Sequence, residues 1–580
     1  MCGIYGSTKI YSKKLIEKKL NRINFRGPDF SGIEIIDNKV VFGHNRLAVI
    51  DLDPRSNQPL FYKNVCIVFN GEIYNFNLIK DELIGLGYVF TTKSDTELIC
   101  ASYLEWGLDC VKKFIGMFSF VIYDKKNEIL YGARDRLGKK PFYYTLSDNC
   151  FEFSSQLSPL SIGNNFSVSE NSVSQFLRWS NIPEPHSIYN EVEKLKPGHY
   201  FTYHINKHNF CTRKYWDFDD ERVDKTISYE DAKQRLNDLI VGATAIRMIA
   251  DVPLGIFLSG GIDSSLIAAV AQKNSKTPIK TFSIKFTYDS YDESPYAEKI
   301  AKYIGSDHKT IVCDSAEAIS LINDYHNYFD EPFGDSSAIP TMLLAKRTRE
   351  YVTVALSGDG GDEGFLGYTR YNWIDSFNRL KLVPFFIKNM VGKTLAHTKP
   401  ARLKAIGTAL STKKTEDIYK SFLSVKDLRF LSDPAKSDCN EFEERLYSRK
   451  NILERVSDYD IKSYLNNDIN TKVDRATMAF SLECRAPLMD HRIIEFSRIL
   501  PTAYKLSNGV KKKILKDILA DYIPRNLFDR PKAGFGAPIA HWFRQELKDY
   551  VYEVLTEHNL TKIPNLNIKY IKKAIDNHMT

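Results

Sequence analysis

The sequence predicts a two-domain protein, with an α+β domain followed by an α/β domain on a doubly wound parallel sheet and a helical C-terminal part. The chain has 580 residues, which is too long for a single hydrophobic core. The first 200 or so residues favour strands and turns, whereas residues 253–356 alternate between strands and helices. From about Gly361 onward the pattern is mostly helical.

In the first region, short β-branched and aromatic runs predict strands. The clearest runs are residues 40–44, 65–69 and 118–123. The last two runs are followed by turn-forming residues, Asn70-Gly71 and Asp124, and residues 95–106 predict a helix. We expect this domain to occupy residues 2–205, with a polar linker over residues 206–229.

The second domain is expected over residues 230–580. Strands are predicted at residues 253–258, 279–286, 309–313 and 351–356. Helices are predicted at residues 264–272, 295–304, 316–329 and 338–349. Alternation of this kind indicates a parallel sheet with helices on both faces, whose ligands bind at the carboxyl ends of strands.

Composition excludes several classes of protein. A net charge of +8 is small for this length, so we expect no nucleic-acid partner. The nine cysteines are odd in number and form no C-x-x-C pair, which argues against a disulfide framework or structural zinc. No apolar run approaches the roughly 18 residues of a spanning helix, so we expect a cytoplasmic protein without a membrane partner. The sequence leaves open whether the protein forms a homodimer.

A glycine-rich loop follows the first predicted strand of the second domain. It reads Ser259-Gly260-Gly261-Ile262-Asp263-Ser264-Ser265 and leads directly into a helix. Glycines let the backbone approach an anion, and a helix N-terminus offers free N–H groups. The loop resembles the pyrophosphate loop of N-type ATP pyrophosphatases; the alternative is a glycine turn capped by serine.

A second loop, Ser357-Gly358-Asp359-Gly360-Gly361-Asp362-Glu363, follows the last predicted strand. Three acids at a strand end repel one another unless a cation is present. Together with Asp263, this loop predicts Mg²⁺ shared between carboxylates and ATP phosphates. A solvated acidic turn is the alternative.

The N-terminus, Met1-Cys2-Gly3, offers a candidate nucleophile. Removal of Met1 would give Cys2 an α-amine that can act as general base for its own thiol. Taken alone, a chance cysteine is the better explanation. Other segments change this, because they match the class II glutamine amidotransferases in order. They are residues 26–29 (RGPD), 43–48 (GHNRLA), 70–75 (NGEIYN), 94–97 (SDTE) and 133–138 (ARDRLG).

Glutamine recognition explains why these residue types occur together. Arg46 suits the α-carboxylate, since a guanidinium binds bidentately, and Asp95, helped by Glu72, suits the α-ammonium. Asn70 and the Gly71 N–H resemble the family's oxyanion hole. Each residue also has a structural alternative, such as a surface ion pair for Arg46 or a type I′ hairpin turn for Asn70-Gly71.

With both sites in this order, the whole sequence resembles the glutamine-hydrolysing asparagine synthetase family. Further matching segments are residues 183–188, 281–284, 292–294, 330–337, 473–479, 482–490 and 530–535. The resemblance implies an N-terminal-nucleophile hydrolase αββα sandwich followed by an ATP pyrophosphatase domain. It also implies that aspartate is adenylated with ATP and Mg²⁺ and that ammonia from glutamine then displaces AMP.

The resemblance assigns roles residue by residue. The catalytic set is Cys2, Asn70, Gly71, Asp359 and Lys532, of which Lys532 could otherwise be a surface charge. The glutamine-binding set is Arg46, Leu47, Asn70, Gly71, Glu72 and Asp95. The ATP-binding set is Phe257, Leu258, Ser259, Gly260, Gly261, Asp263, Ser264, Ser265, Ile284, Ser357 and Gly358. The metal-binding set is Asp263 and Asp362.

Other functions remain open. The main rival is an amidotransferase of the same architecture that acts on another carboxylate, such as a sugar uronate or a peptide acid. Departures from the family pattern at residues 154–156 and 362–368 bear on the acceptor environment. A β-lactam synthetase-like cyclase fits less well because the N-terminal cysteine is retained, and a silent scaffold fits less well because the charged site residues are present.

Overall fold

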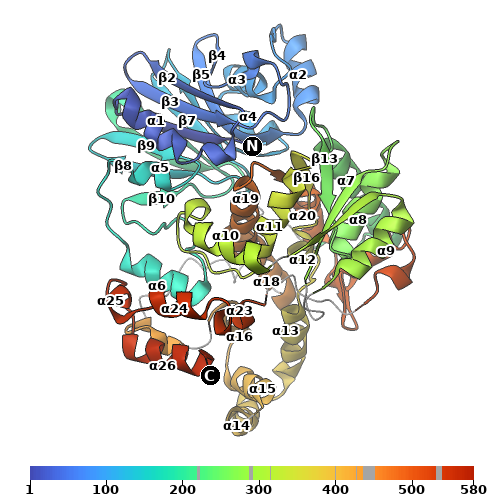
Figure 1. Cartoon of the computed structure of the whole chain (residues 1–580). Coiled ribbons are helices and arrows are strands. Elements are labelled where there is room, and N and C mark those ends of the chain that lie inside the picture. The colour runs from blue at the N-terminus through green and yellow to red at the C-terminus, as the bar shows by residue number, and fades with distance from the viewer. Residues whose placement is uncertain are drawn as a thin grey trace.

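The computed structural model describes residues 1–217, 223–286, 292–313, 315–398, 400–425, 428–434, 451–530 and 538–579. Figure 1 shows two parts of the molecule, with blue and cyan strands in one and a smaller green and yellow sheet in the other. Within the described residues, no helix has the length and apolar character needed to cross a membrane.

The first part contains two six-stranded antiparallel sheets. One sheet has the order β10 (Val192–Lys194), β8 (Tyr143–Ser147), β9 (Cys150–Ser154), β1 (Gly3–Ser7), β3 (Val40–Arg46) and β2 (Phe30–Ile36). The other has the order β12 (Asn209–Lys214), β11 (His199–His204), β7 (Ile129–Arg134), β6 (Gly116–Asp124), β5 (Val65–Ile73) and β4 (Leu60–Tyr62).

The two sheets stack face to face around one apolar core. Ile4 and Phe42 from the first sheet and Val68 and Val121 from the second belong to the same buried cluster. On the outer faces, α1 (Lys13–Asn21) packs on the first sheet, and α2 (Phe76–Gly85) and α3 (Asp95–Trp106) pack on the second. The four layers confirm the predicted αββα sandwich.

The second part is built on a five-stranded parallel sheet. Its order is β15 (Asp307–Val312), β14 (Lys280–Lys285), β13 (Leu254–Phe257), β16 (Val354–Leu356) and β17 (Glu483–Arg485). Helices α7 (Tyr229–Arg247), α8 (Ile262–Lys273), α9 (Ser294–Ile304) and α22 (Lys513–Leu519) share one core cluster. Helices α10 (Ser315–Tyr328), α11 (Ala338–Arg349) and α19 (Thr471–Met478) share another. The doubly wound fold is thus confirmed.

The strand order reverses between β13 and β16, which creates a topological switch point. The glycine-rich loop follows β13 and the acidic loop follows β16, so the two predicted ATP segments meet at the same sheet edge. The rest of this part is mainly helical, as predicted. Its longer helices include α13 (Thr369–Arg379), α14 (Phe385–Ala396), α15 (Ala401–Ser411), α16 (Thr415–Leu423), α18 (Ile452–Tyr459), α20 (His491–Ile499) and α26 (Ile568–Met579).

The structure differs from the sequence prediction in three places. Asn70-Gly71 is not a turn, because β5 continues through it to Ile73 and pairs with β6. A fifth strand, β17, was missed; three residues are too short a run to predict from sequence. The segment expected as a linker contains β12, which pairs with β11.

Candidate active site

The predicted nucleophile lies at the start of the first strand. Cys2 directly precedes β1 and is buried, as is Met1. The Cys2 backbone N–H donates to Asn70 Oδ1 at 3.0 Å. Burial raises the pKa of the Cys2 thiol, while the chain-terminal ammonium, the Leu47 N–H and Arg46 act in the opposite direction. The nitrogen that would become the catalytic amine on removal of Met1 therefore lies beside Asn70.

Asn70 and Gly71 lie within β5, opposite Ser119 and Phe118. The Asn70 amide Nδ2 donates to Ser155 Oγ at 3.5 Å. Gly71 has a φ of +154°, and a Cβ atom there would lie only 2.1 Å from the Met117 carbonyl oxygen. A side chain at position 71 is therefore excluded, so no side chain covers the Gly71 backbone next to the Asn70 amide.

Arg46 ends β3 and holds the loop that follows it. Its guanidinium donates to the Asp53 carbonyl oxygen at 3.2 Å and to Asn57 Oδ1 at 2.8 Å. It also donates to the backbone carbonyl of Asp51. These contacts fix the planar guanidinium close enough to Cys2 to oppose the rise that burial causes in the pKa of the thiol.

Glu72 and Asp95 form a buried acidic pair near the same site. Asp95 Oδ2 accepts the Ile73 N–H at 2.9 Å, and Glu72 Oε2 lies 3.2 Å from Arg485 Nη2. Burial raises the pKa of Asp95 to about 7. Burial also raises the pKa of Glu72, and the charge of Asp95 adds to that rise. A ligand ammonium would stabilise the charged form of both carboxyls.

The second domain closes the Cys2 site through strand β17. Glu483 Oε2 lies 2.6 Å from the Met1 ammonium, and Arg485 Nε donates to Glu483 Oε1 at 2.6 Å. Burial alone would raise the pKa of Glu483, but the ammonium and Arg485 bring it down to about 2. Sequence reasoning missed both residues, since residues 482–490 were noted only for the family resemblance.

A second interdomain contact reaches the backbone of the nucleophile itself. Asp474 on α19 accepts two hydrogen bonds from Arg26, at 2.8 and 3.1 Å, and one from Lys140 at 3.1 Å. Arg26 Nε in turn donates to the Cys2 carbonyl oxygen at 3.1 Å. Burial opposes the charge of Asp474, but Arg26, Lys140 and Arg475 hold its pKa well below the usual range. Asp474 was also missed from sequence, because its partners lie more than 300 residues away.

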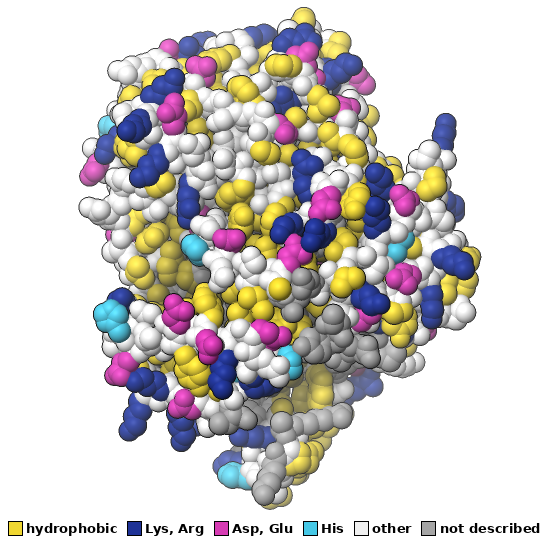
Figure 2. All heavy atoms as spheres, in the orientation of Figure 1, with side chains coloured by type: hydrophobic (Ala, Val, Ile, Leu, Met, Phe, Trp, Pro, Cys, Tyr) yellow, Lys and Arg dark blue, Asp and Glu magenta, His cyan; other side chains and the backbone are white. Residues whose placement is uncertain are grey.

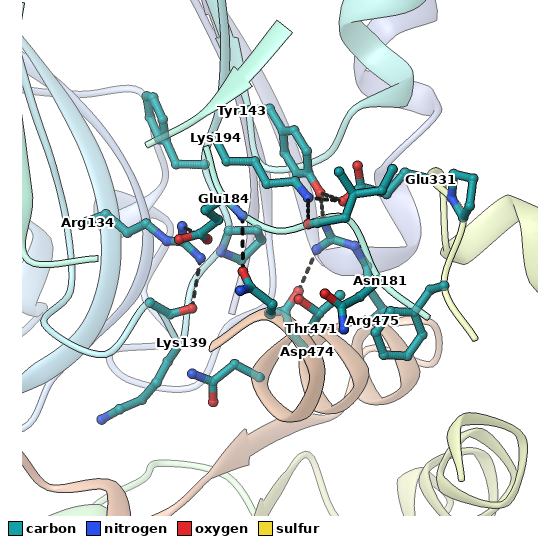
Figure 3. Close-up of a pocket in the computed structure, with 18 residues that line it drawn as sticks. Arg134, Lys139, Tyr143, Asn181, Glu184, Lys194, Glu331, Thr471, Asp474 and Arg475 are labelled. Atoms are coloured by element: carbon teal, nitrogen blue, oxygen red, sulfur yellow. Dashed lines mark hydrogen bonds and ion pairs between the residues drawn. The ribbon is translucent and has the colours of Figure 1, made fainter. Parts of the chain in front are cut away.

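Figure 3 shows further ion pairs across the same boundary. Lys194 lies 2.5 Å from Glu331, whose Oε1 also accepts the Tyr143 hydroxyl at 2.9 Å. Arg475, beside Asp474, donates to the Tyr143 oxygen at 3.3 Å. The small cavity that these residues surround holds about 20 Å³, room for about one water molecule. The two domains are therefore joined by a charged and tightly packed interface.

The glycine-rich loop connects β13 with α8, whose N-cap is Gly261. Gly260 has a φ of +74°, and a Cβ atom there would lie 2.9 Å from the Ala297 nitrogen. The Ser259 N–H donates to Ser264 Oγ at 3.2 Å, and the Gly261 N–H donates to Ser259 Oγ at 3.3 Å. The loop is thus shaped by its own serines, with the helix N-terminus at the adjoining cavity.

That cavity has a volume of about 910 Å³, within the range expected for a bound ligand. Most of the predicted ATP and metal residues line it: Phe257, Leu258, Ser259, Gly260, Gly261, Asp263, Ser264, Ile284, Ser357, Gly358 and Asp362. Asp359, from the predicted catalytic set, lines it as well. Ser265 is fully buried in α8 and is not part of the lining. Lys532 lies outside the described residues.

Lys512 joins the two predicted metal ligands and was not foreseen. Its Nζ lies 2.7 Å from Asp362 Oδ1 and also contacts Asp263. Burial works against its charge, but the two carboxylates raise the pKa of Lys512. Among the described residues, no group of three His, Cys, Asp or Glu side chains forms a metal cage. Two carboxylates that face one cation position fit Mg²⁺ that is also held by phosphates.

A second charged group lines the same cavity. Lys472 Nζ lies 3.0 Å from Asp335 Oδ2 and donates to Ser337 Oγ at 2.9 Å. Burial raises the pKa of Glu363 to about 7, and the charge of Asp362 contributes to that rise. The cavity lining therefore offers both a cation, Lys472, and a neutralisable acid, Glu363, to a polar ligand.

A small cavity lies between the two candidate sites. It has about 20 Å³ of accessible space and reaches Met1 and Met117 on one side. Ser357, Asp359, Val473 and Cys484 line both this cavity and the larger one. Three further charged residues, Lys139, Lys140 and Asp474, also line it. The wall of this cavity is therefore polar in part.

Fold and sites together define an ATP-dependent glutamine amidotransferase, an enzyme of the carbon–nitrogen ligase class. The glutamine amidotransferase domain family matches residues 1–216, and the asparagine synthase family matches residues 235–580. The chain belongs to the asparagine synthase family.

Curated relatives agree with this assignment. The chain is 32% identical over 604 residues to asparagine synthetase [glutamine-hydrolyzing] 1 of Bacillus subtilis, covering 100% of this chain and 93% of the relative. It is 36% identical to putative asparagine synthetase [glutamine-hydrolyzing] 2 of Methanocaldococcus jannaschii, covering 68% of this chain and 81% of the relative. It is also 26% identical to amidase chry2 of Gibberella zeae, covering 97% of this chain and 90% of the relative.

Proposed function

We propose that this protein is a glutamine-dependent asparagine synthetase, with a glutaminase domain at residues 2–205 and a synthetase domain at residues 230–580. The observation that carries the proposal is the shared cavity wall. Ser357, Asp359, Val473 and Cys484 face both the nucleotide cavity and the small cavity that reaches Met1. A nitrogen released beside Cys2 would thus emerge at the acidic loop.

The first half-reaction begins with removal of Met1. The Cys2 amine then accepts the proton of its own thiol, and Sγ attacks the side-chain carbonyl carbon of glutamine. Asn70 and the Gly71 N–H stabilise the oxyanion of the tetrahedral intermediate. Ammonia leaves, and water hydrolyses the thioester to glutamate. Arg46 and Leu47 receive the substrate carboxylate end, and Asp95 with Glu72 receives its ammonium.

The second half-reaction activates the acceptor. The β-carboxylate of aspartate attacks the α-phosphorus of ATP, pyrophosphate leaves, and β-aspartyl-AMP forms. The loop at residues 259–265 would hold pyrophosphate, while Phe257, Leu258 and Ile284 would contact adenosine. Ammonia then attacks the acyl carbon, AMP leaves, and a proton is lost; Asp359, at the mouth of the small cavity, is placed to assist this step.

Asp263 and Asp362 would hold Mg²⁺, which neutralises phosphate charge when it is bound. Lys512 contacts both carboxylates, so a metal that they held would have to displace its ammonium from them. Lys532 is proposed to neutralise charge on the phosphate and acyl oxygens.

The acceptor is tested by incubating the protein with ATP, Mg²⁺ and glutamine together with single acids: aspartate, glutamate, a uronic acid or a peptide with an acidic side chain. Mass spectrometry identifies the amidated product. Asparagine as the main product supports the proposal. Amidation of the uronate or the peptide acid in place of aspartate would assign the protein to the rival function.

The adenylate route is tested with ¹⁸O in the acceptor carboxylate. Attack on the α-phosphorus transfers one labelled oxygen to AMP. Label in inorganic phosphate would instead mean attack on the γ-phosphorus and an acyl phosphate, which would contradict the proposed intermediate.

A further inference from the structure

Helices α14 and α15 form a hairpin that extends away from the body of the protein, at the bottom of Figure 1. Their backbones are in close contact through two glycines. A Cβ atom on Gly407 would lie 2.4 Å from the Ala396 nitrogen and 2.6 Å from the Gly392 carbonyl oxygen. A Cβ atom on Gly392 would lie 2.5 Å from Ser411 Oγ. Small residues therefore form the helix–helix contact and let the two backbones approach closely.

Several large apolar side chains of α14 and of the turn before it are exposed. Leu382 is 95% exposed, Phe386 72% and Met390 66%. Phe386 and Met390 are four residues apart and so lie on one face of α14. Further exposed apolar residues of the same region are Leu380, Phe385, Ile387, Val391 and Leu403. Exposed apolar side chains grouped in this way mark an interaction surface, and yellow side chains are visible there in Figure 2.

The same segment is strongly basic. Residues 379–415 contain nine Lys and Arg residues and no Asp or Glu: Arg379, Lys381, Lys388, Lys393, Lys399, Arg402, Lys404, Lys413 and Lys414. Because the whole chain has a net charge of +8, this segment accounts for all of the excess positive charge. The described side chains of Lys393, Lys404, Lys413 and Lys414 are exposed.

A cavity of about 260 Å³ lies at the base of the hairpin. Lys388, Lys413 and Lys414 line it together with apolar side chains such as Leu380 and Leu410. Glu416 also lines it but is neutralised by Arg455, whose Nη1 lies 2.5 Å away. Lysines around such a space provide point charges for a phosphate group.

We propose that the α14–α15 hairpin docks on the surface of an anionic phospholipid membrane. The outward apolar side chains enter the boundary between headgroups and acyl chains, and the lysines meet the headgroup phosphates. The helices have 12 and 11 residues, shorter than the roughly 20 needed to span a bilayer, so the hairpin lies on the surface. The proposal runs against the expectation, drawn from net charge and run length, that the protein has no membrane partner.

Flotation of the full-length protein with lipid vesicles tests the proposal. One set of vesicles contains phosphatidylglycerol and phosphatidylcholine in equal parts, and the other contains phosphatidylcholine alone. We expect at least about tenfold more protein bound to the anionic vesicles, with the difference shrinking at high salt. The pair Phe386→Ser and Met390→Ser should remove most of this binding, and the pair Lys393→Gln and Lys404→Gln should weaken it.

The matched control is the pair Leu78→Ser and Val89→Ser, since each side chain is 74% exposed but lies on the first domain. It should bind anionic vesicles like the unaltered protein. All variants should retain glutaminase activity in the absence of vesicles, which establishes that they fold. In a second measurement, the fluorescence of Phe386→Trp should shift to shorter wavelength with anionic vesicles.

Several outcomes would overturn the proposal. They are absence of binding to the anionic vesicles, equal binding to neutral ones, or full binding by the Phe386 and Met390 double variant. Binding to double-stranded DNA without binding to vesicles would assign the surface to nucleic acid. Dimerisation in sedimentation velocity that the same double variant abolishes, again without vesicle binding, would assign it to a second copy of the chain.

Discussion

The two candidate sites differ in how their charges are balanced. Around Cys2, buried ionic groups are paired across the domain boundary, through Arg485–Glu72 and Arg26–Asp474. Around the glycine-rich loop, the charged groups line a cavity of about 910 Å³, in which Lys512 bridges Asp263 and Asp362. The first site is assembled by the fold, whereas the second leaves room for a large charged ligand.

This difference indicates which parts of the protein each site depends on. The Cys2 site depends on contacts from both domains, so a change in the second domain can disturb chemistry in the first. The nucleotide cavity is lined by segments of the second domain alone, among them the loops after β13 and β16 and residues of α11, α19 and α22. Substitutions should therefore separate into those that stop one half-reaction and those that act through the interface.

The largest effect is expected for Cys2→Ala. Glutaminase activity and glutamine-dependent synthesis should fall at least about a thousandfold, while synthesis from ammonium should stay largely intact, because the thiol serves only nitrogen release. Assays with the two nitrogen sources compare these rates. Cys211→Ala, which removes an exposed cysteine, is the control. Continued use of glutamine by Cys2→Ala would refute the nucleophile assignment.

Asp263→Asn or Asp362→Asn should lower synthesis about 10²- to 10³-fold with either nitrogen source, because each change removes charge from the proposed metal position. Glutaminase activity should change little. The rate of pyrophosphate release at several Mg²⁺ concentrations measures the effect, with the exposed Asp521→Asn as the control. Near-normal synthesis at ordinary Mg²⁺ would contradict the metal assignment.

Asp474→Asn should lower glutaminase kcat about 10- to 100-fold, although Asp474 lies in the second domain. The change leaves Arg26, which holds the Cys2 carbonyl oxygen, without its buried counter-charge. It should also destabilise the fold by about 3–5 kcal/mol. Glutaminase kinetics and thermal unfolding together separate the two effects.

Asp458→Asn provides the matched control, since Asp458 forms a similarly buried ion pair with Arg498 at 2.7 Å inside the second domain. It should destabilise the protein comparably and leave glutaminase kcat unchanged. Equal losses of kcat in both variants would mean that Asp474 has only a structural role. Partial recovery in Asp474→Glu would support the positioning role.

The smallest effect concerns pH. The pKa of Asp95 is raised to about 7 by burial, so its carboxyl becomes neutral as pH falls through that value. Only the charged form pairs with the ammonium of glutamine, so kcat/KM for glutamine should fall up to about tenfold from pH 7 to 6. Asp95→Asn should lower kcat/KM and remove this inflection. A flat profile for the unaltered protein over this range would contradict the role given to Asp95.

Periodicity and turn chemistry predicted much of the fold, as the helix at residues 95–106 illustrates. They failed at Asn70-Gly71, where a dipeptide typical of hairpin turns lies inside a strand because β6 pairs along its whole length. Local pattern also cannot reveal Lys512, Asp474 or Glu483. Their roles depend on partners more than 100 residues away, which only the fold brings together.

The most direct test of the account is whether ammonia passes from the Cys2 site to the nucleotide cavity without being released to the solvent. The protein is supplied with ATP, Mg²⁺, aspartate, ¹⁵N-amide glutamine and an excess of unlabelled ammonium near neutral pH, and product nitrogen is read by mass spectrometry. In bulk water most released ammonia becomes ammonium, which cannot attack an acyl carbon. Transfer through the small cavity predicts ¹⁵N in the product far above its share of the mixed pool. A label that simply follows the pool would contradict the account and mean that the two domains work independently.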